Sequence, residues 1–229
     1  MDIAAALEQV KRNIELARGR SVHAARQVQL LAVSKTQPLE KIAAAYAAGQ
    51  QHFGENKVQE LVEKQQQLPQ LNWHLIGHLQ RNKVKYVIGK TRLIHSLDSI
   101  SLAAEIEKRS AAASVITEVL IQVNIAEEQS KSGVFVPELA GFVSELAAYP
   151  HIKLRGLMTI GPMVEDYEQI RPVFRELRLL FERERARELP YAEMSYLSMG
   201  MSHDYMIAVE EGANIVRVGS SIFGARNYA

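Results

Sequence analysis

The chain has 229 residues, of which 47% are hydrophobic and 23% are charged, so it is long enough to bury a substantial core. Its 27 basic and 26 acidic residues nearly cancel, which excludes the strong positive field expected of a protein that binds nucleic acid or an anionic membrane. The sequence contains no cysteine, and this excludes disulfides, thiolate metal sites and a cysteine nucleophile.

The pattern of apolar residues predicts a cytoplasmic protein. The N-terminal residues are charged from Asp2 onward and lack the apolar centre and cleavage site of a signal peptide. No uninterrupted apolar stretch approaches the roughly 18 residues that a membrane span needs. The lack of cysteine also suits a reducing compartment.

The predicted secondary structure begins with an amphipathic helix over residues 2–26, where Ile3, Leu7, Val10 and Ile14 recur at near-helical spacing. Short apolar runs then alternate with longer helical patterns. The predicted strands span residues 29–34, 52–54, 73–77, 93–97, 114–124, 154–160, 194–198 and 215–218. The predicted helices span residues 38–48, 56–67, 81–88, 99–111, 137–148, 166–187 and 205–211, with a short last helix from residue 220.

Eight strand and helix pairs in a chain of this length favour a closed (β/α)₈ TIM barrel, of the α/β class, over an open doubly wound sheet. We expect one domain over residues 1–229, in which residues 1–26 form the leading helix and residues 27–229 form the barrel. In such a barrel the active site lies at the C-terminal ends of the strands, and the loops after strands 7 and 8 frequently hold a phosphate.

Lys35 directly follows the first predicted strand and therefore lies on the expected active-site rim. A lysine ammonium is costly in an apolar setting, so a lysine at this place suits a site where an amine is needed, for example to form a Schiff base. The alternative is an ordinary strand-end lysine whose ammonium reaches solvent.

Two loops on the same rim contain glycine and serine. Ser198 ends the seventh predicted strand, and Gly200 and Ser202 follow it, before Asp204, which is placed to cap the next helix. Gly219 and Ser220 follow the eighth strand. Backbone N–H groups and serine hydroxyls bind phosphate, although each loop alone is more often an ordinary turn. An amine that faces a phosphate site fits pyridoxal 5′-phosphate (PLP).

Arg217 lies near the end of the eighth strand, two residues before Gly219. From there its guanidinium can reach the pyridine nitrogen of a cofactor whose phosphate is held by Gly219 and Ser220. A guanidinium stays charged and accepts no hydrogen bond, so it keeps that nitrogen unprotonated and weakens the ring as an electron sink. The alternative is that Arg217 pairs with a carboxylate inside the barrel.

The chain resembles the pyridoxal-phosphate-binding homeostasis proteins, the YggS-like and PROSC-like family, which share the barrel of alanine racemase. The likeness covers nearly the whole chain, and its motifs are specific as a group. They are Leu31-Ala32-Val33-Ser34-Lys35-Thr36, Phe53-Gly54-Glu55-Asn56, Trp73-His74-Leu75-Ile76-Gly77, Leu79-Gln80-Arg81-Asn82-Lys83, Leu154-Arg155-Gly156-Leu157-Met158, Leu197-Ser198-Met199-Gly200-Met201-Ser202 and Val216-Arg217-Val218-Gly219.

The resemblance implies that Lys35 carries the cofactor as an internal aldimine. It also implies that Ser202, Gly219 and Ser220 hold the phosphate, with Arg217 at the pyridine nitrogen. Ser198 or the Met201 backbone is a further candidate to bind the phosphate. Asn56 and His74 are further candidates to contact the cofactor. A satisfied core histidine is the alternative for His74.

Two other features of the family's pattern have open roles. Lys131 matches a loop after the fifth strand, where it either approaches the pocket and receives the aldehyde or lies on an exposed loop. Arg81, Lys83 and Lys85 are typical of a solvated helix face.

The resulting hypothesis is a PLP carrier or buffer without substantial catalysis, which takes part in intracellular vitamin B6 and amino-acid homeostasis. The alternatives are a weakly active amino-acid racemase and an aldolase-like Schiff-base enzyme. The chain ends at Ala229, so we expect no second domain of the racemase kind to supply a tyrosine to the other face of the substrate. We expect a monomer that contacts PLP-dependent apo-enzymes transiently.

Overall fold

A computed structural model of the chain describes residues 2–23, 27–127, 132–162 and 164–224. It begins with helix α1 (Ile3–Arg20), whose first turn is capped by the Asp2 carboxylate, which accepts the Ala5 N–H at 3.1 Å. The prediction that this helix extends to residue 26 was wrong. Ser21 leaves the helical conformation, and its hydroxyl donates to the Glu210 carbonyl oxygen at 2.7 Å instead of continuing the helix.

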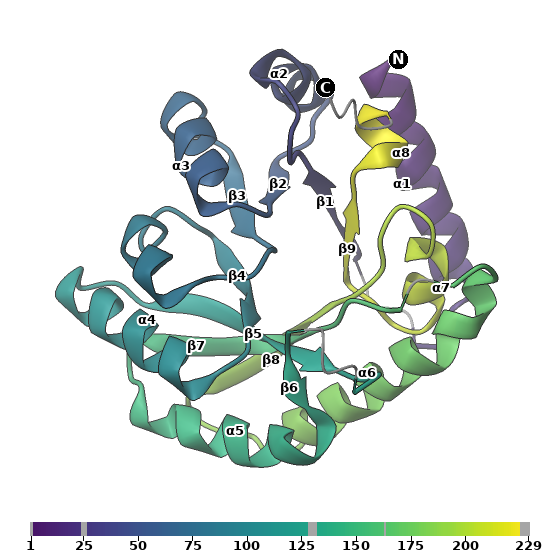
Figure 1. The fold of residues 1–229 in the computed structure, drawn as a ribbon. Coiled ribbons are helices and arrows are strands. Elements are labelled where there is room, and N and C mark those ends of the chain that lie inside the picture. Colours follow the sequence, from purple (N-terminus) through teal and green to yellow (C-terminus); the bar gives the residue numbers. More distant parts are fainter. Residues whose placement is uncertain (1, 24–26, 128–131, 163, 225–229) are drawn as a thin grey trace.

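Eight parallel strands form the barrel, and the helices surround it (Figure 1). The prediction of a (β/α)₈ barrel with a leading helix is confirmed, because β4 pairs with β5 and closes the ring. The barrel strands are β1 (Gln29–Val33), β2 (His52–Glu55), β3 (Asn72–Leu75), β4 (Leu93–Leu97), β5 (Thr117–Asn124), β7 (Ile152–Met158), β8 (Ala192–Ser198) and β9 (Ile215–Val218).

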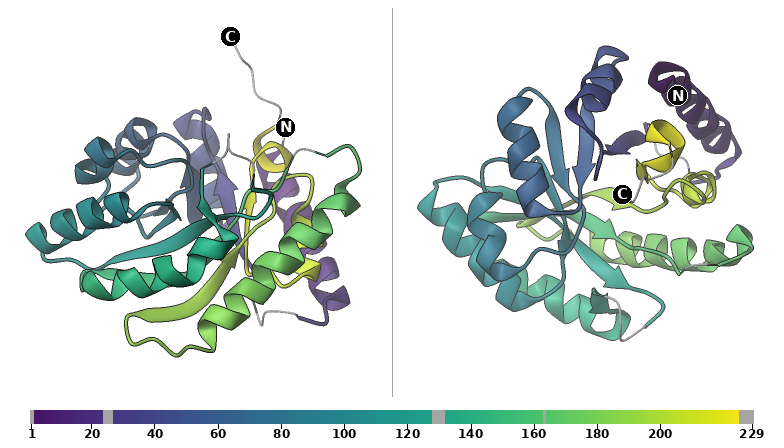
Figure 2. Two further views of the ribbon diagram at one scale, coloured as in Figure 1. Left: turned by 60° about the horizontal axis from the view of Figure 1, so that its bottom comes forward. Right: turned by 45° about the horizontal axis from the view of Figure 1, so that its top comes forward.

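The connecting helices follow the barrel strands in chain order. They are α2 (Leu39–Ala47), α3 (Val58–Gln67), α4 (Ile100–Ala112), α5 (Leu139–Glu145), α6 (Arg171–Arg185), α7 (Tyr205–Glu210) and α8 (Ser220–Phe223). Short 3₁₀ turns supplement them at η1 (Arg81–Tyr86), η2 (Val136–Glu138), η3 (Leu146–Ala148) and η4 (Tyr167–Ile170). Helix α1 packs against α7 and α8, so the first and last described elements are neighbours on one side of the barrel (Figure 2).

The structure differs from the prediction in two further elements. The expected helix over residues 81–88 is the 3₁₀ turn η1, which is six residues long and packs against α4. A short strand β6 (Val134–Phe135), which the sequence pattern did not predict, pairs with the end of β5. Both lie in βα connections, where the barrel constrains the two ends of the segment but not its internal conformation.

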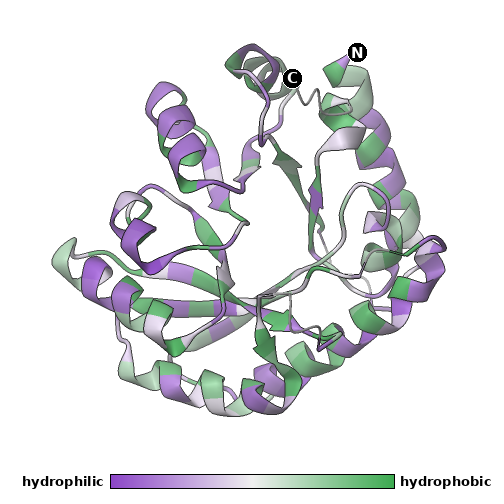
Figure 3. Ribbon diagram, viewed as in Figure 1, coloured by the Kyte–Doolittle hydropathy of each residue, from purple (hydrophilic) through white to green (hydrophobic). Residues whose placement is uncertain are grey.

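The strands divide the apolar residues between two clusters, because successive side chains of a strand point to opposite faces. An inner cluster fills the barrel and contains Leu31, Val33, Ile76, Leu93, Leu120, Met158 and Ile215. A much larger outer cluster, with members such as Leu30, Phe53 and Trp73, lies between the strands and the helices. Figure 3 shows green, apolar segments on the strands, with some purple segments among them, inside a ring of helices that are partly polar.

The described residues include no helix that is long and apolar enough to span a bilayer. The longest helix, α1, has 18 residues and carries charged side chains along its length.

Candidate functional site

A cavity of about 520 Å³ lies at the C-terminal ends of the barrel strands. Seven of the nine residues predicted from the sequence line it, and they come from strand β9 and from the segments that follow β1, β2, β8 and β9. They are Lys35, Asn56, Met201, Ser202, Arg217, Gly219 and Ser220. The cavity has the size of a typical small-molecule site and is lined by both polar and apolar side chains.

Lys35 begins the turn after β1 and is partly buried at the cavity wall. The next residue, Thr36, has a φ of 63°, a left-handed conformation that a β-branched residue rarely adopts. The Thr36 N–H is bound by the Glu60 carboxylate at 2.6 Å, so helix α3 holds this turn in place. The backbone direction at Lys35 is therefore set by a contact from a neighbouring helix.

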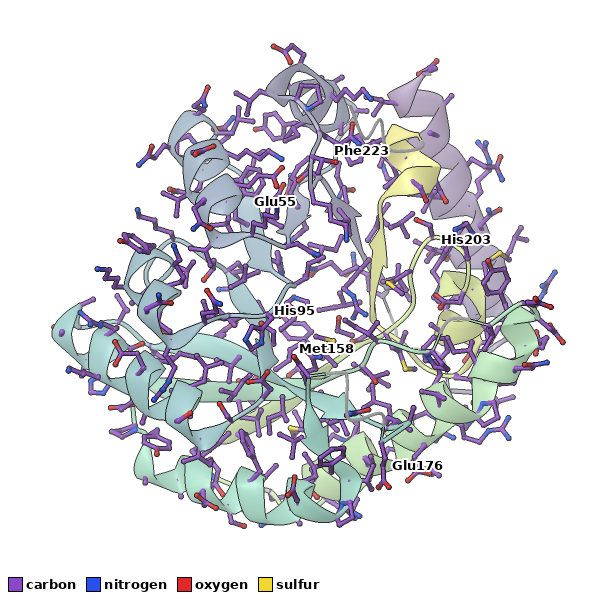
Figure 4. The ribbon with its side chains drawn as sticks, in the orientation of Figure 1. Glu55, His95, Met158, Glu176, His203 and Phe223 are labelled. Carbon is purple, nitrogen blue, oxygen red and sulfur yellow. The ribbon has the colours of Figure 1, made fainter. Side chains whose placement is uncertain are left out.

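A buried ion cluster supports the same turn from the outer face of the barrel. Lys64 of α3 donates to the Ser34 carbonyl oxygen, to Glu55 Oε1 and to Glu60 Oε1, at 2.7, 2.8 and 2.6 Å. Burial raises the pKa of the Glu55 carboxyl, while the Lys64 ammonium acts in the opposite direction. In Figure 4 the Glu55 side chain lies between the barrel wall and the helix that follows β2. Lys64 thereby fixes Ser34, the residue before Lys35, and balances the buried carboxylate.

The loops after β8 and β9 meet at a hydrogen bond from the Gly219 N–H to the Ser202 hydroxyl oxygen, at 3.1 Å. A Cβ atom on Gly219 would lie 3.2 Å from the Val33 carbonyl oxygen, so glycine allows this close approach to β1. Hydroxyl and backbone N–H groups are thus brought together beside the cavity. Ser220, at the start of α8, is exposed on the same wall.

Asp204 occupies the N-cap position of α7, but its side chain makes no capping bond to the helix, so this part of the prediction was wrong. Its carboxylate accepts the Met201 N–H within the loop after β8. Gly200 in that loop has a φ of 91° and packs against Tyr205 and Ala208, which leaves no room for a side chain. These contacts determine the path of residues 200–204, including Ser202.

Arg217 is 4% exposed and points into the barrel, in register with Leu31 of the inner cluster. Its guanidinium donates to the Ser198 carbonyl oxygen at 2.9 Å, to the Ser198 hydroxyl at 2.7 Å and to the Thr159 carbonyl oxygen at 2.7 Å. Burial lowers the pKa of Arg217 to about 10, and the group remains a cation at neutral pH. The hydrogen bonds run to neutral oxygens, in contrast to the carboxylate partner considered as an alternative.

The two remaining predicted residues, Ser198 and His74, lie inside the barrel and do not line the cavity. Ser198 is behind Arg217 and binds its guanidinium. His74 is 2% exposed and hydrogen-bonded on both ring nitrogens, to His52 at 3.1 Å and His95 at 3.0 Å. This arrangement matches the alternative of a satisfied core histidine.

Several residues of the cavity wall were not predicted from the sequence. His78 lies beside Asp98, with 3.2 Å between the imidazole Nδ1 and the carboxylate, and His203 stacks on Tyr167 at 5.5 Å. Gln122 and the other lining residues Val33, Ile76, Gly77, Val123, Asn124, Ser132 and Ile160 complete the list. The sequence could have indicated these residues by their position at strand ends, because the C-terminal end of every barrel strand contributes to this rim. His203 is labelled in Figure 4, on the loop after β8.

The open features of the sequence lie elsewhere. Lys131 falls outside the described residues. Arg81 and Lys85 are exposed on η1, and Lys85 lies 4.9 Å from the Tyr86 ring centre. None of the described members of this basic face lines the cavity.

Comparison with known proteins places this site in a family. A family model described as the N-terminal domain of alanine racemase matches residues 6–227. The pyridoxal phosphate homeostasis protein of Aquifex aeolicus is 46% identical over 224 residues, which cover 97% of this chain and 96% of that protein.

Two solved structures cover the chain almost completely. A crystal structure described as an unknown protein from Bifidobacterium adolescentis has a TM-score of 0.92 and 35% identity, and the match covers 97% of this chain and 94% of that one. PipY of Synechococcus elongatus, solved with PLP bound, has a TM-score of 0.84 and 35% identity, with 97% and 100% of the two chains covered. The chain therefore belongs to the alanine racemase N-terminal domain family and, within it, to the pyridoxal phosphate homeostasis proteins.

Proposed function

We propose that this chain binds PLP in the cavity at the C-terminal end of the barrel, with the Lys35 amine bonded covalently to the cofactor aldehyde. One observation carries the proposal: Lys35 lines the same cavity as the Ser202 and Gly219 junction and the Arg217 cation. An amine, a set of phosphate donors and a ring-nitrogen partner are the three groups that PLP requires of a protein.

The donor set suits the two ends of the cofactor. The Ser202 hydroxyl and the N–H groups near Gly219 and Ser220 offer neutral donors to a phosphate, and Asn56 lies on the same wall. The Met201 N–H is already bound by the Asp204 carboxylate, so we do not assign it to the phosphate. Arg217 is buried and already held by three hydrogen bonds, so it faces a ring nitrogen at little cost in side-chain entropy. Ser198 and His74 then act behind Arg217.

We further propose that the chain carries or buffers PLP within the cell and does not catalyse a reaction at a substantial rate. Two kinds of relative support this proposal. The similar proteins of Aquifex aeolicus and Escherichia coli are pyridoxal phosphate homeostasis proteins, and the PipY structure contains bound PLP. A cationic Arg217 at the ring nitrogen keeps that nitrogen unprotonated, which disfavours the carbanion chemistry of an efficient racemase. The exposed rim residues Met201 and Ile160 leave the cavity open to transient contact with an apo-enzyme.

Absorbance spectroscopy of the purified chain tests covalent binding. We expect PLP to produce a band near the visible edge, which is lost when borohydride reduces the imine to a secondary amine and so labels the lysine permanently. Lys35→Ala removes the band, whereas the matched control Lys85→Ala, on exposed η1, retains it. Lys131→Ala is measured in parallel, and loss of the band in that variant alone would transfer the covalent role from Lys35 to Lys131.

The carrier role requires a second measurement, which combines transfer with turnover. We expect the loaded chain to reactivate a PLP-dependent apo-enzyme faster than Lys35→Ala mixed with the same total PLP. A coupled assay with alanine and a panel of amino acids is run on the same sample. Racemisation at ordinary enzyme rates, near 10 s⁻¹, would refute the carrier proposal in favour of the racemase alternative.

A further inference from the structure

Three histidines form a continuous hydrogen-bonded chain through the interior of the barrel. His52 Nδ1 lies 3.1 Å from His74 Nε2, and His74 Nδ1 lies 3.0 Å from His95 Nε2. His95 Nδ1 in turn lies 3.0 Å from the Ser198 hydroxyl, which accepts from Arg217 at 2.7 Å. We refer to His52, His74, His95 and Ser198 as the imidazole relay.

The relay connects two cavities at opposite ends of the barrel. His52, the first residue of β2, lines a polar cavity of about 660 Å³ together with Gln29 and Gln50 of the N-terminal side. Arg217 lines the candidate site at the C-terminal side. The intermediate residues His95 and Ser198 are fully buried beside the inner apolar cluster, and in Figure 4 His95 lies near Met158 at the centre of the barrel.

Burial favours the neutral form of each histidine of the relay. It lowers the pKa of His52, and it lowers the pKa of His74 to about 3, with smaller contributions in the same direction from the neighbouring His52 and Arg92. Burial also lowers the pKa of His95 well below its ordinary value, with His74 and Arg217 acting in the same direction. A neutral imidazole has one donor nitrogen and one acceptor nitrogen, so each link of the relay has a direction.

The two ends of the relay require the same direction. At the end near the candidate site, the Arg217 guanidinium can only donate. Within the described residues the remaining partner of the Ser198 hydroxyl is His95 Nδ1. The hydroxyl proton therefore goes to His95 Nδ1, which places the His95 proton on Nε2 and directs it to His74. The same step repeats from His74 to His52. At the His52 end, Gln29 Nε2 also lies 3.2 Å from His52 Nδ1, so the amide N–H and the His74 N–H share the lone pair of this nitrogen, which again requires an unprotonated Nδ1.

We infer that His52, His74 and His95 are positioning residues for Arg217, and that they act as a relay with one fixed polarity, each carrying its proton on Nε2. The reverse polarity would point the His95 N–H at Ser198, which would leave the serine proton without an acceptor among the described residues. Because chains of hydrogen bonds polarise one another, the fixed direction strengthens each link. The inference that Arg217 serves a cofactor rests on the proposed function, whereas the polarity of the relay does not.

Nitrogen NMR of the ¹⁵N-labelled chain without PLP tests the polarity. We expect His52, His74 and His95 to be neutral Nε2–H tautomers at pH 7, assigned with single substitutions. A charged ring, or an Nδ1–H tautomer at any of the three positions, would overturn the relay. In His74→Phe, which keeps a ring but removes both nitrogens, we expect His95 to populate the Nδ1–H tautomer because its Nε2–H loses an acceptor.

Arg217 itself reports the positioning role in the same samples. We expect the exchange of its guanidinium N–H groups with water to be about five-fold faster in His74→Phe, as for the loss of one hydrogen bond. The control is Leu93→Ala, which removes volume from the inner cluster but no relay atom. If N–H exchange is accelerated equally in the two variants, the histidines affect Arg217 only through packing, and the positioning role is overturned.

PLP binding provides the readout for function. We expect the Kd of PLP to rise about five-fold in His74→Phe relative to Leu93→Ala, with a shift of the absorbance band that reports the ring environment. Equal PLP affinity in these variants would refute the link to the cofactor. If the unmodified chain does not bind PLP, the proposed function fails, and the NMR measurements on the PLP-free chain still decide the relay.

Discussion

The Glu60 carboxylate accepts the backbone N–H of Thr36 at 2.6 Å and so ties helix α3 to the residue that follows Lys35. The two residues are 24 positions apart in the chain. Lys64 donates to the same Glu60 oxygen and to the Ser34 carbonyl oxygen on the other side of Lys35. The conformation of the turn that presents Lys35 to the cavity is therefore maintained from outside the cavity.

Removal of Glu60 is expected to weaken this turn. Glu60→Ala leaves Thr36 without its acceptor and Lys64 with one fewer counter-charge, so we expect the free energy of unfolding to fall by about 1–3 kcal/mol. Urea denaturation measures this change, and PLP titration measures the expected loss of affinity. Glu63→Ala, an exposed position on the same helix, is the matched control. An effect of Glu60→Ala no larger than that of the control would contradict the role of this contact.

Glycine is required in the loop after β8 for a steric reason. A Cβ on Gly200 would lie 2.6 Å from the Ala208 Cβ and 2.9 Å from the Tyr205 Cα, at a φ of 91°. We expect Gly200→Ala to lower the free energy of unfolding by at least about 2 kcal/mol and to weaken PLP binding. Gly141→Ala, in helix α5 with open space around it, is expected to be neutral or to stabilise the chain by up to about 1 kcal/mol. Thermal unfolding of both variants checks this contrast.

Ser202 is expected to recognise the phosphate and not the ring. Ser202→Ala removes one hydroxyl at the junction with Gly219, so we expect the Kd of PLP to rise about ten-fold, as for a hydrogen bond to a charged group. The Kd of pyridoxal, which has no phosphate, should remain unchanged in the same variant. A parallel loss of affinity for both ligands would instead assign Ser202 a structural role in the loop.

Acid should destabilise the chain through the buried histidines. In the unfolded chain an imidazole of pKa 6.5 takes up a proton below that pH, whereas folded His74, with a pKa of about 3, stays neutral. Because the unfolded state binds more protons between these values, the free energy of unfolding falls as the pH is lowered from 6.5 toward 3.

The slope of this loss is expected to include about 1.4 kcal/mol per pH unit from His74. Arg92 and His52 are the charged and titratable groups that contribute to its lowered pKa, after burial. Urea unfolding at several pH values between 7 and 4.5 measures the slope, which should be shallower in His74→Phe by up to this amount. Leu93→Ala should lower the curve without changing its slope. An unchanged slope in His74→Phe would show that His74 has the same pKa in the folded and the unfolded chain, which would contradict this prediction.

The sequence predicted the barrel because its apolar periods are local. Each strand and most helices carry their own pattern, and the eight repeats of that pattern are sufficient to indicate a closed parallel sheet. The ends were less accurate, as Ser21 shows, because its helix stops where a side chain finds a partner on α7.

The histidine positions illustrate the limit of sequence analysis for the site. His52, His74 and His95 each occupy an inward position of a strand, in phase with Ile76 and Leu93, and this alternation was visible in the sequence. The stagger of neighbouring strands decides which of these side chains meet, and no single strand contains that information. His74 was accordingly placed near the cofactor, whereas it lies below the cavity and contacts two other imidazoles.

The sequence by itself determined the class of fold, the strand ends at which Lys35, Ser202, Arg217 and Gly219 stand, and the family to which they correspond. Those properties follow from residue type and local period. Only the tertiary structure decided that Glu60 and Lys64 hold the turn of Lys35, that Ser202 binds Gly219, and that Arg217 is supported by Ser198 and a relay of histidines. Each of these contacts joins separate elements, and closure of the barrel is the physical event that brings them within hydrogen-bonding distance.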